Sequence, residues 1–208
     1  MNCIVCEEVS TQPFSLEDKK YWRCEQCFAV FLDKKARLSF EEEKIRYEQH
    51  NNNILDEDYR KFLSKLFKPM KNRINPRSRG LDFGCGSGPA LAEMFKEEGF
   101  IMDLYDPFFY PNKSVFHNNY DFITCTEAAE HFFEPAKEFY RLDKMLLEGG
   151  FLGVMTTFMQ PNKDFNHWHY RRDPTHVVFY QEETFGFIAS KMNWSYEIPQ
   201  KDVVLFNK

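Results

Sequence analysis

The stretch Leu81-Asp82-Phe83-Gly84-Cys85-Gly86-Ser87-Gly88-Pro89 decides the fold class of this chain of 208 residues. A short apolar strand runs into glycines, and a helix is predicted over residues 89–98, closed by Gly99. Glycines let a ligand approach the backbone closely, and proline suits the first helical turn, where its missing N–H costs nothing. This order of strand, loop and helix predicts a nucleotide-type βαβ unit.

The spacing of the glycines narrows the class of ligand. A dinucleotide fingerprint needs G-x-G-x-x-G, whereas Gly84, Gly86 and Gly88 give G-x-G-x-G, and Pro89 stands where the third glycine would be. No lysine follows the loop, as a P-loop would require. The loop therefore predicts neither of these two nucleotide sites.

Strand-like segments alternate with helical ones on the carboxyl side of this loop. The expected strands cover residues 101–105, 120–125, 151–157, 194–198 and 202–206, with a helix over 134–147. Such alternation favours a mostly parallel α/β sheet with helices on both faces. Ligands of such sheets bind beyond the carboxyl ends of the strands, where we expect Gly84, Asp106, Cys125 and Thr157.

In its motifs and their order, the segment from about residue 80 to 208 resembles the class I S-adenosylmethionine-dependent methyltransferases. Asp82 and the three glycines match the first motif of that family, an acidic residue followed by G-x-G-x-G. Glu127-Ala128-Ala129-Glu130-His131 resembles the E-h-h-E-H segment of its ubiquinone-biosynthesis-like branch. The resemblance implies a Rossmann-like sheet, mostly parallel with an antiparallel last strand.

The resemblance also implies S-adenosylmethionine as cofactor, with Asp106 accepting hydrogen bonds from both ribose hydroxyls. The implied cofactor-binding residues are Asp82, Gly84, Cys85, Gly86, Gly88, Asp106, Pro107, Phe108, Thr126, Glu127 and His131. The 14 residues 107–120 leave little room for the usual third strand, which we expect over 114–117. Phe108 and Phe109 are expected to flank the adenine, although two Phe residues are more often simple core.

Methyl transfer requires alignment of nucleophile and methyl group, and a base only where the nucleophile is protonated. His131 is the first candidate base because it follows the strand 120–125 closely; the alternative is a histidine that packs under the cofactor or caps a helix. His176 is the second candidate, because Asp173-Pro174-Thr175-His176 predicts a fixed turn before a helix.

The loop 166–176 combines imidazole, guanidinium and aromatic groups, and it predicts substrate contacts from His167, Trp168, Tyr170, Arg171 and Arg172. An arginine there would bind a carboxylate or phosphate, and the aromatic rings would cover a ring or sugar face. A metal set of His167, His169 and His176 is the alternative, but it lacks an evident carboxylate ligand.

Cys3, Cys6, Cys24 and Cys27 form C-x2-C-x17-C-x2-C, a spacing typical of structural zinc sites. Four thiolates leave no open position for water, so we expect a structural ion in a small ribbon over residues 1–37, with a strand over 28–32. A redox dithiol pair is the alternative. Cys85 and Cys125 are expected to be buried small hydrophobes.

Residues 38–76 predict a helical connector before a domain over 77–208. Ser39 and Glu42 form a capping box for a helix over 40–49, the Asn51-Asn52-Asn53 run interrupts it, and a second helix begins near Asp56. Pro69 and Pro76 are expected to end that helix, and residues 68–79 to form a basic connector.

The composition is that of a globular protein, with 43% hydrophobic and 28% charged residues. No segment approaches the roughly 20 apolar residues that span a bilayer, and residues 1–10 lack a secretory signal, so we expect a cytoplasmic protein without membrane contact. The net charge of −5 argues against wholesale coating of nucleic acid, yet residues 60–81 carry eight basic and no acidic side chains.

Three functions follow from these features. The first is methylation of a small hydroxylated or anionic metabolite, held by the loop after the strand 151–157. The second is RNA methylation, with the zinc ribbon and the basic segment as the RNA-binding surface. The third is a non-catalytic, zinc-dependent interaction module on a cofactor-binding fold. The sequence carries no signal for the oligomeric state.

Overall fold

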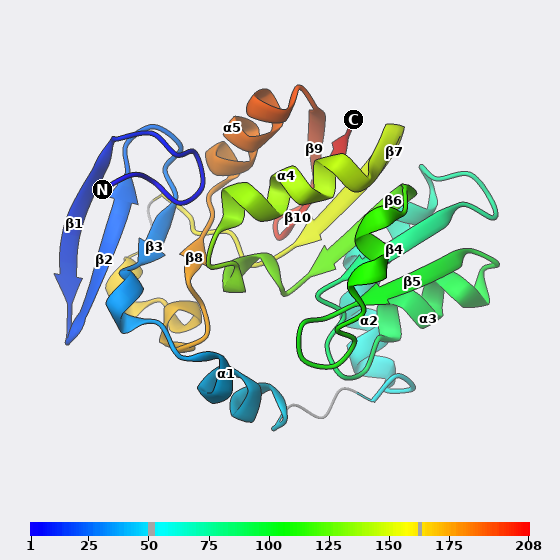
Figure 1. Ribbon diagram of the computed structural model, residues 1–208, viewed down its shortest axis with the longest axis horizontal. Helices are drawn as coiled ribbons and strands as arrows, with labels where there is room; N and C mark the ends of the chain where they lie inside the picture. Colours follow the sequence, from blue (N-terminus) through cyan, green and yellow to red (C-terminus); the bar gives the residue numbers. More distant parts are fainter. Residues whose placement is uncertain (50–52, 162–163) are drawn as a thin grey trace.

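A mixed sheet of six strands forms the centre of the computed structural model, which describes residues 1–49, 53–161 and 164–208. Its order is β5-β4-β6-β7-β10-β9 (Figure 1). The strands are β4 (Arg79–Phe83), β5 (Ile101–Tyr105), β6 (Tyr120–Thr126), β7 (Leu146–Met155), β9 (Ser195–Gln200) and β10 (Val203–Asn207). The first four are parallel, and β10 is antiparallel to both of its neighbours. The predicted α/β sheet with an antiparallel last strand is thus confirmed.

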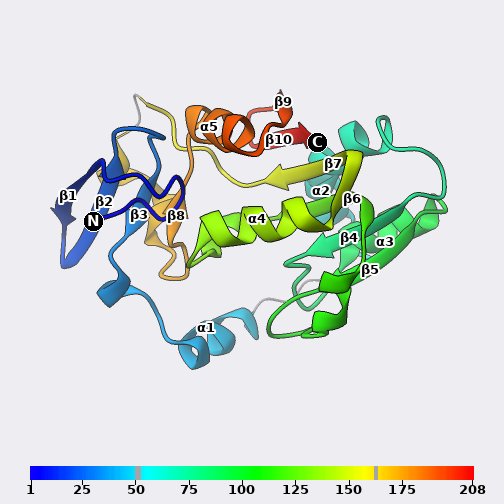
Figure 2. The ribbon, with the colours of Figure 1, turned by 45° about the horizontal axis from the view of Figure 1, so that its top comes forward.

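Helices cover both faces of this sheet. The helices α2 (Glu57–Lys71) and α3 (Ala90–Glu97) pack on one face, where Leu66 and Phe95 meet Phe122 of β6. The helices α4 (Pro135–Met145) and α5 (Glu182–Met192) pack on the other, where Phe139 and Phe185 meet residues of β7 and β10. Figure 2 shows α4 beside β7, and α5 beside β9 and β10.

The predicted third strand over residues 114–117 is wrong. Among the described residues, β5 is therefore the edge strand of the large sheet. Residues Lys113–His117 form a 3-10 helix, η2, instead. Asn112 caps it by accepting from the Ser114 N–H at 3.0 Å, and the Tyr120 hydroxyl donates to the Val115 carbonyl at 3.1 Å. These local bonds hold a compact turn where a longer segment could add a strand.

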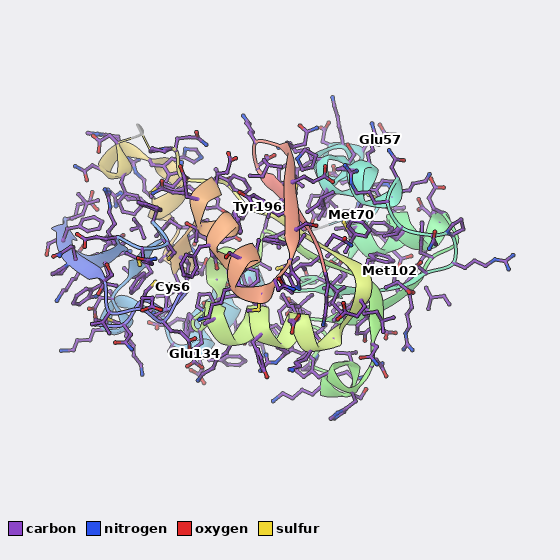
Figure 3. The ribbon with its side chains drawn as sticks, turned by 90° about the horizontal axis from the view of Figure 1, so that it is seen from above. Cys6, Glu57, Met70, Met102, Glu134 and Tyr196 are labelled. Carbon is purple, nitrogen blue, oxygen red and sulfur yellow. The ribbon has the colours of Figure 1, made fainter. Side chains whose placement is uncertain are left out.

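The amino-terminal residues form a second, smaller sheet. Its strands β1 (Thr11–Leu16), β2 (Lys19–Cys24) and β3 (Val30–Leu32) are antiparallel, and β8 (Val178–Phe179) continues it beside β3. The predicted strand 28–32 is therefore β3. Because β8 follows the loop after β7, the small sheet is built from both ends of the chain. Figure 3 shows Cys6 of this part far from Met102 of the large sheet.

The connector contains α1 (Phe40–Tyr47) and α2. The capping box of α1 is confirmed, with Ser39 and Glu42 bonded reciprocally, and Asp56 caps α2 by accepting from the Tyr59 N–H at 2.8 Å. The predicted interruption at Asn51 and Asn52 lies outside the described residues. The helix α2 continues through Pro69 to Lys71, so its predicted end at Pro69 is wrong; the proline stands in the last turn.

Short 3-10 helices complete the fold. They are η1 (Lys34–Ala36), η3 (Ala129–His131), η4 (Phe165–His167) and η5 (His169–Arg172), besides η2. None of the described helices combines the length and the apolar character that crossing a bilayer requires.

Candidate active site

A cavity of about 600 Å³ opens at the carboxyl ends of β4, β5 and β6. This volume lies within the range of small-molecule sites. All the residues that the sequence predicts to bind the cofactor line this cavity, and His176 lines it too. The helix α1 closes the cavity with Phe40, Glu43 and Tyr47, and α2 adds Tyr59 and Leu63.

The glycine loop gives the cavity a floor of backbone. Gly84 and Gly86 have φ of +78° and +64°, a conformation that glycine adopts without strain. The N–H groups of Gly84 and Cys85 both donate to the Tyr105 carbonyl, at 2.8 and 3.2 Å, which ties the loop to β5. A Cβ on Gly84 would lie 2.5 Å from the Cβ of Ala128. This position therefore has no room for a side chain.

Asp106, 7% exposed, organises the loop from the end of β5. Its Oδ2 accepts from the Gly86 N–H at 3.0 Å, and its Oδ1 accepts from the N–H groups of Phe108 and Phe109 at 2.8 and 3.0 Å. A carboxylate offers about four acceptor positions. One position on Oδ2 thus stays available to a ligand, beside the loop.

Asp82 lies beneath the loop at the end of β4. It is buried and accepts from the Thr124 hydroxyl at 2.8 Å. Burial raises its pKa to about 6, and the Thr124 hydrogen bond opposes that rise. The single hydrogen bond from Thr124 thus only partly offsets the effect of burial on the Asp82 carboxylate. Asp82 also lines the cavity.

An aromatic stack forms one wall. The Phe108 ring stacks on Phe40 of α1, with centroids 4.5 Å apart, and lies 5.1 Å from the Tyr47 ring. The sequence analysis missed α1 as part of the site. A signal was present, because Phe40, Glu43 and Tyr47 recur at three and four residues on one helical face.

Two histidines from distant segments face each other across the opposite wall. The rings of His131 and His176 have centroids 4.9 Å apart. The Nδ1 of His131 lies 3.0 Å from the Thr175 carbonyl, and the Nδ1 of His176 lies 2.7 Å from the Tyr170 carbonyl. A carbonyl accepts only, so each neutral ring donates from Nδ1 and keeps a lone pair on Nε2. Burial lowers the pKa of His176, which favours that neutral form.

Glu130 stands beside these rings and is 1% exposed. Its Oε1 accepts from the Tyr170 hydroxyl at 2.5 Å, while its Oε2 has no hydrogen-bond partner in the part of the chain that the structure describes. Glu127, three residues earlier, has a φ of +47°, and burial raises its pKa to about 9. At neutral pH Glu127 is therefore protonated, and Glu130 keeps one buried oxygen without a partner among the described residues.

The comparisons with known proteins agree with this geometry. The sequence matches the family described as "Methyltransferase domain" over residues 50–197. The chain belongs to this methyltransferase family. The protein is therefore an enzyme. No curated protein matches its sequence.

The solved structures that are similar to this chain include two methyltransferases. Burkholderia thailandensis 1,6-didemethyltoxoflavin-N1-methyltransferase, solved with 1,6-didemethyltoxoflavin and S-adenosylhomocysteine, is 11% identical, with 95% of this chain and 99% of that chain covered and a TM-score of 0.56. An Archaeoglobus fulgidus S-adenosylmethionine-dependent methyltransferase is 20% identical, with 65% and 69% covered and a TM-score of 0.51. At such identities the likeness shows the fold, a Rossmann-like methyltransferase sheet.

The methyltransferase does not bring the predicted substrate residues of the loop 166–176 to the cavity. Trp168, Tyr170 and Arg171 are buried, His167 and Arg172 are exposed, and none of these side chains lines the cavity. The Arg171 guanidinium instead donates to the Asn166 carbonyl at 2.7 Å and to Glu17 at 3.2 Å. The loop thus joins the two sheets, and its polar groups are used in that junction.

The four amino-terminal cysteines of the methyltransferase meet in one buried cluster. The Cys3 and Cys27 sulfurs are 3.6 Å apart, and those of Cys6 and Cys24 are 3.5 Å apart. Zn–S bonds of about 2.3 Å place the sulfurs of a tetrahedral site about 3.8 Å apart. The cluster therefore fits a structural zinc ion. Cys85 and Cys125 are buried outside it, as predicted.

The basic segment 60–81 is largely paired within the methyltransferase. Five of its eight basic side chains, which are Arg60, Lys65, Lys71, Arg73 and Arg79, form ion pairs with carboxylates. Examples are Lys65 with Asp202 at 2.5 Å and Lys71 with Glu98 at 2.6 Å. Three of the pairs join α2 to α3 and to the turn between β9 and β10, and the other two lie between neighbouring segments of the chain. They lend no support to an RNA-binding surface.

Proposed function

We propose that the protein transfers a methyl group from S-adenosylmethionine to a small molecule. One observation carries the proposal: a single cavity has the glycine loop and Asp106 on one side and the paired rings of His131 and His176 on the other. Cofactor and acceptor would thus meet in line, and alignment is the main requirement of this reaction.

The cavity fits the cofactor. Gly84 and Gly86 allow the backbone to approach it, Asp106 offers the free position on Oδ2 to a ribose hydroxyl, and Phe108 offers a ring face to the adenine. Thr126 and Glu127 stand at the end of β6. When bound there, S-adenosylmethionine supplies a methyl group on a positively charged sulfur.

A hydroxylated acceptor agrees better with the cavity than an anionic one. The carboxyl groups of Glu130 and Asp173 lie beside the two histidines, whereas Arg171 and Arg172 do not line the cavity. We propose that the Nε2 of His131 or His176, each with a free lone pair, takes the hydroxyl proton. The backbone carbonyls that bond to Nδ1 hold both rings in this orientation.

Further parts of the proposal concern the rest of the chain. A structural zinc ion bound by Cys3, Cys6, Cys24 and Cys27 would make residues 1–37 a zinc ribbon. The E-h-h-E-H segment supports membership of the ubiquinone-biosynthesis-like branch. The six free cysteines support a reducing, cytoplasmic location. Because α2 packs on the large sheet, we propose a domain boundary before α2 in place of one at residue 76.

Calorimetry with S-adenosylhomocysteine tests the proposal through Gly84→Ala. The added methyl would meet Ala128 and would occupy a left-handed conformation, so we expect affinity to fall by about tenfold or more. The matched control is Gly99→Ala, which has a φ of +87° but open space around its Cβ. Equal affinity in the wild type and the folded Gly84→Ala variant would contradict binding at this loop.

A further inference from the structure

We infer that Glu138 of α4 accepts a hydrogen bond from the adenine amino group of the cofactor, and that it thereby selects adenine among flat bases. The inference rests on the proposed function, because it adds a residue to the same cofactor site. Glu138 lines the cavity together with Asp106. The cofactor residues predicted from the sequence lie at or after the ends of β4, β5 and β6, and none of them lies on α4.

A chain of contacts connects Glu138 to the end of β5. The Arg141 guanidinium donates to the Glu138 Oε2 at 2.5 Å, and its Cζ lies 4.9 Å from the centre of the Phe116 ring. The Phe116 ring lies 4.6 Å from the ring of Tyr105, which directly precedes Asp106. Burial raises the pKa of Tyr105, Arg141 lowers it, and the charges of Glu138 and Asp106 raise it further. Glu138 thus lies near the point where Asp106 would hold the ribose, to which the adenine is attached.

The compact turn η2 leaves this side of α4 open to the cavity. Phe116 of η2 packs against the apolar core that contains Phe139 and Leu142 of α4. In the described chain no strand forms between β5 and β6. The side chains of Glu138 and Arg141 therefore reach the cofactor side of the cavity.

Glu138 has the acceptor that an amino group needs. Its side chain is 22% exposed, and Arg141 holds its Oε2. The other oxygen, Oε1, accepts no hydrogen bond from any residue that the structure describes. Burial raises the pKa of Glu138, and the pair with Arg141 opposes that rise, which favours the ionised form. Because a buried N–H without a partner is costly, a free carboxylate oxygen in this wall favours a ligand with a donor there.

The other side chains at this end of the cavity are apolar rings. Phe108, Phe109 and Phe132 line the cavity, and the Phe132 ring lies 6.1 Å from that of Phe139, the neighbour of Glu138. Such rings stack on any flat base, so they cannot distinguish adenine from hypoxanthine, which has a carbonyl oxygen in place of the amino group. The Glu138 carboxylate can, because it accepts from an amino N–H and repels a carbonyl oxygen.

Calorimetry on the full chain with S-adenosylhomocysteine and S-inosylhomocysteine tests this role. The second ligand carries hypoxanthine in place of adenine. We expect the wild type to prefer the adenine ligand by about tenfold or more, and Glu138→Gln, whose amide also donates, to lose most of this preference. The matched control is Glu93→Gln on α3, which also removes a carboxylate paired with a basic residue three positions later, but outside the cavity. It should keep the wild-type preference.

A second measurement needs no substitution. An analogue of S-adenosylhomocysteine with purine in place of adenine lacks only the amino group, and the wild type should bind it about tenfold more weakly or worse. Equal affinity of the wild type for these two ligands, or an unchanged preference in the folded Glu138→Gln variant, would overturn the role of Glu138 and leave the proposed function standing. A wild type that does not bind S-adenosylhomocysteine would overturn both.

Discussion

Asp106 is the residue on which the cofactor side of the cavity depends. Its carboxylate holds three backbone N–H groups and keeps one free acceptor position. Asp106→Ala removes all of these, and hydrogen bonds to a charged group are worth about 1.5–3 kcal/mol each. We expect the affinity for S-adenosylhomocysteine to fall roughly 10- to 150-fold, measured by calorimetry.

The alanine substitution also removes the hydrogen bonds that hold the surrounding backbone. Lower affinity would then follow from a displaced loop as well as from the lost ligand contact, so a second variant is needed. Asp106→Asn keeps an acceptor at Oδ1 and should retain more affinity than the alanine variant. If the folded alanine variant binds as tightly as the wild type, Asp106 does not contact the ribose.

Glu43 gives the stability a pH dependence. It is 7% exposed on α1, and burial raises its pKa to about 7, partly opposed by the Tyr47 hydroxyl. Between the ordinary pKa of 4.5 and 7, the folded state binds more protons than the unfolded state. This group's contribution to the free energy of unfolding is therefore full below about pH 4.5 and is lost as the pH rises to about 7.

Glu43→Gln should remove this loss. We expect its free energy of unfolding to exceed that of the wild type by on the order of 1 kcal/mol at pH 8, and to differ little at pH 4.5. Urea unfolding at the two pH values measures this. Glu41→Gln, at an exposed position on the same helix, should leave the pH dependence unchanged. Parallel behaviour of the two variants would mean that Glu43 ionises freely.

At the scale of elements, α2 packs closely on the large sheet. Leu66 is fully buried, and a Cβ on Gly153 of β7 would lie 2.7 Å from its Cδ1, so the helix lies close against the strand. Leu66→Ala should lower the free energy of unfolding by about 2–5 kcal/mol. Lys61→Ala, exposed on the same helix, should change it by less than about 0.5 kcal/mol. If α2 were a free linker, the two variants would cost the same in urea unfolding.

Elements with strong local signals could be predicted from the sequence. The strands β4, β5 and β6 show apolar runs, and Asp56 and Ser39 mark helix starts by their capping chemistry. The glycine loop specified the cofactor side of the cavity, since its requirement for backbone space is local. By contrast, the sequence could not distinguish η2 from a short strand, because a segment of five residues is too short to show the periodicity of either.

The acceptor side of the cavity could not be predicted, because long-range contacts determine it. Arg171 looked like a ligand for an anion, but it bonds to Glu17, which lies 154 positions earlier in the sequence. His131 and His176 were both named, yet their approach depends on β8 joining β3. No local sequence pattern predicts such a strand pairing. Glu130 lies close to His176 only in the arrangement that this pairing creates.

At the scale of the whole molecule, the amino-terminal residues and the cavity are connected. Leu32 of β3 donates its N–H to the Val177 carbonyl at 2.8 Å, and Val177 donates to the Glu130 carbonyl at 2.7 Å. The cysteine cluster also belongs to the same apolar core as Phe139 of α4. The small sheet therefore supports the segment that carries His176, on the acceptor side of the cavity.

If the four cysteines hold the proposed zinc ion, its removal should disturb the acceptor side of the cavity and spare the cofactor side. We expect faster hydrogen exchange in residues 1–37 and 173–179 after chelation or in Cys24→Ser, because β3 supports β8. Peptides that cover β4 and the glycine loop should keep their protection, and S-adenosylhomocysteine should still bind. Zn²⁺ added back to the chelated wild type should restore protection, which separates metal loss from irreversible damage. Exchange that rises only within residues 1–37 would show that the segment with His176 holds its place without support from those residues.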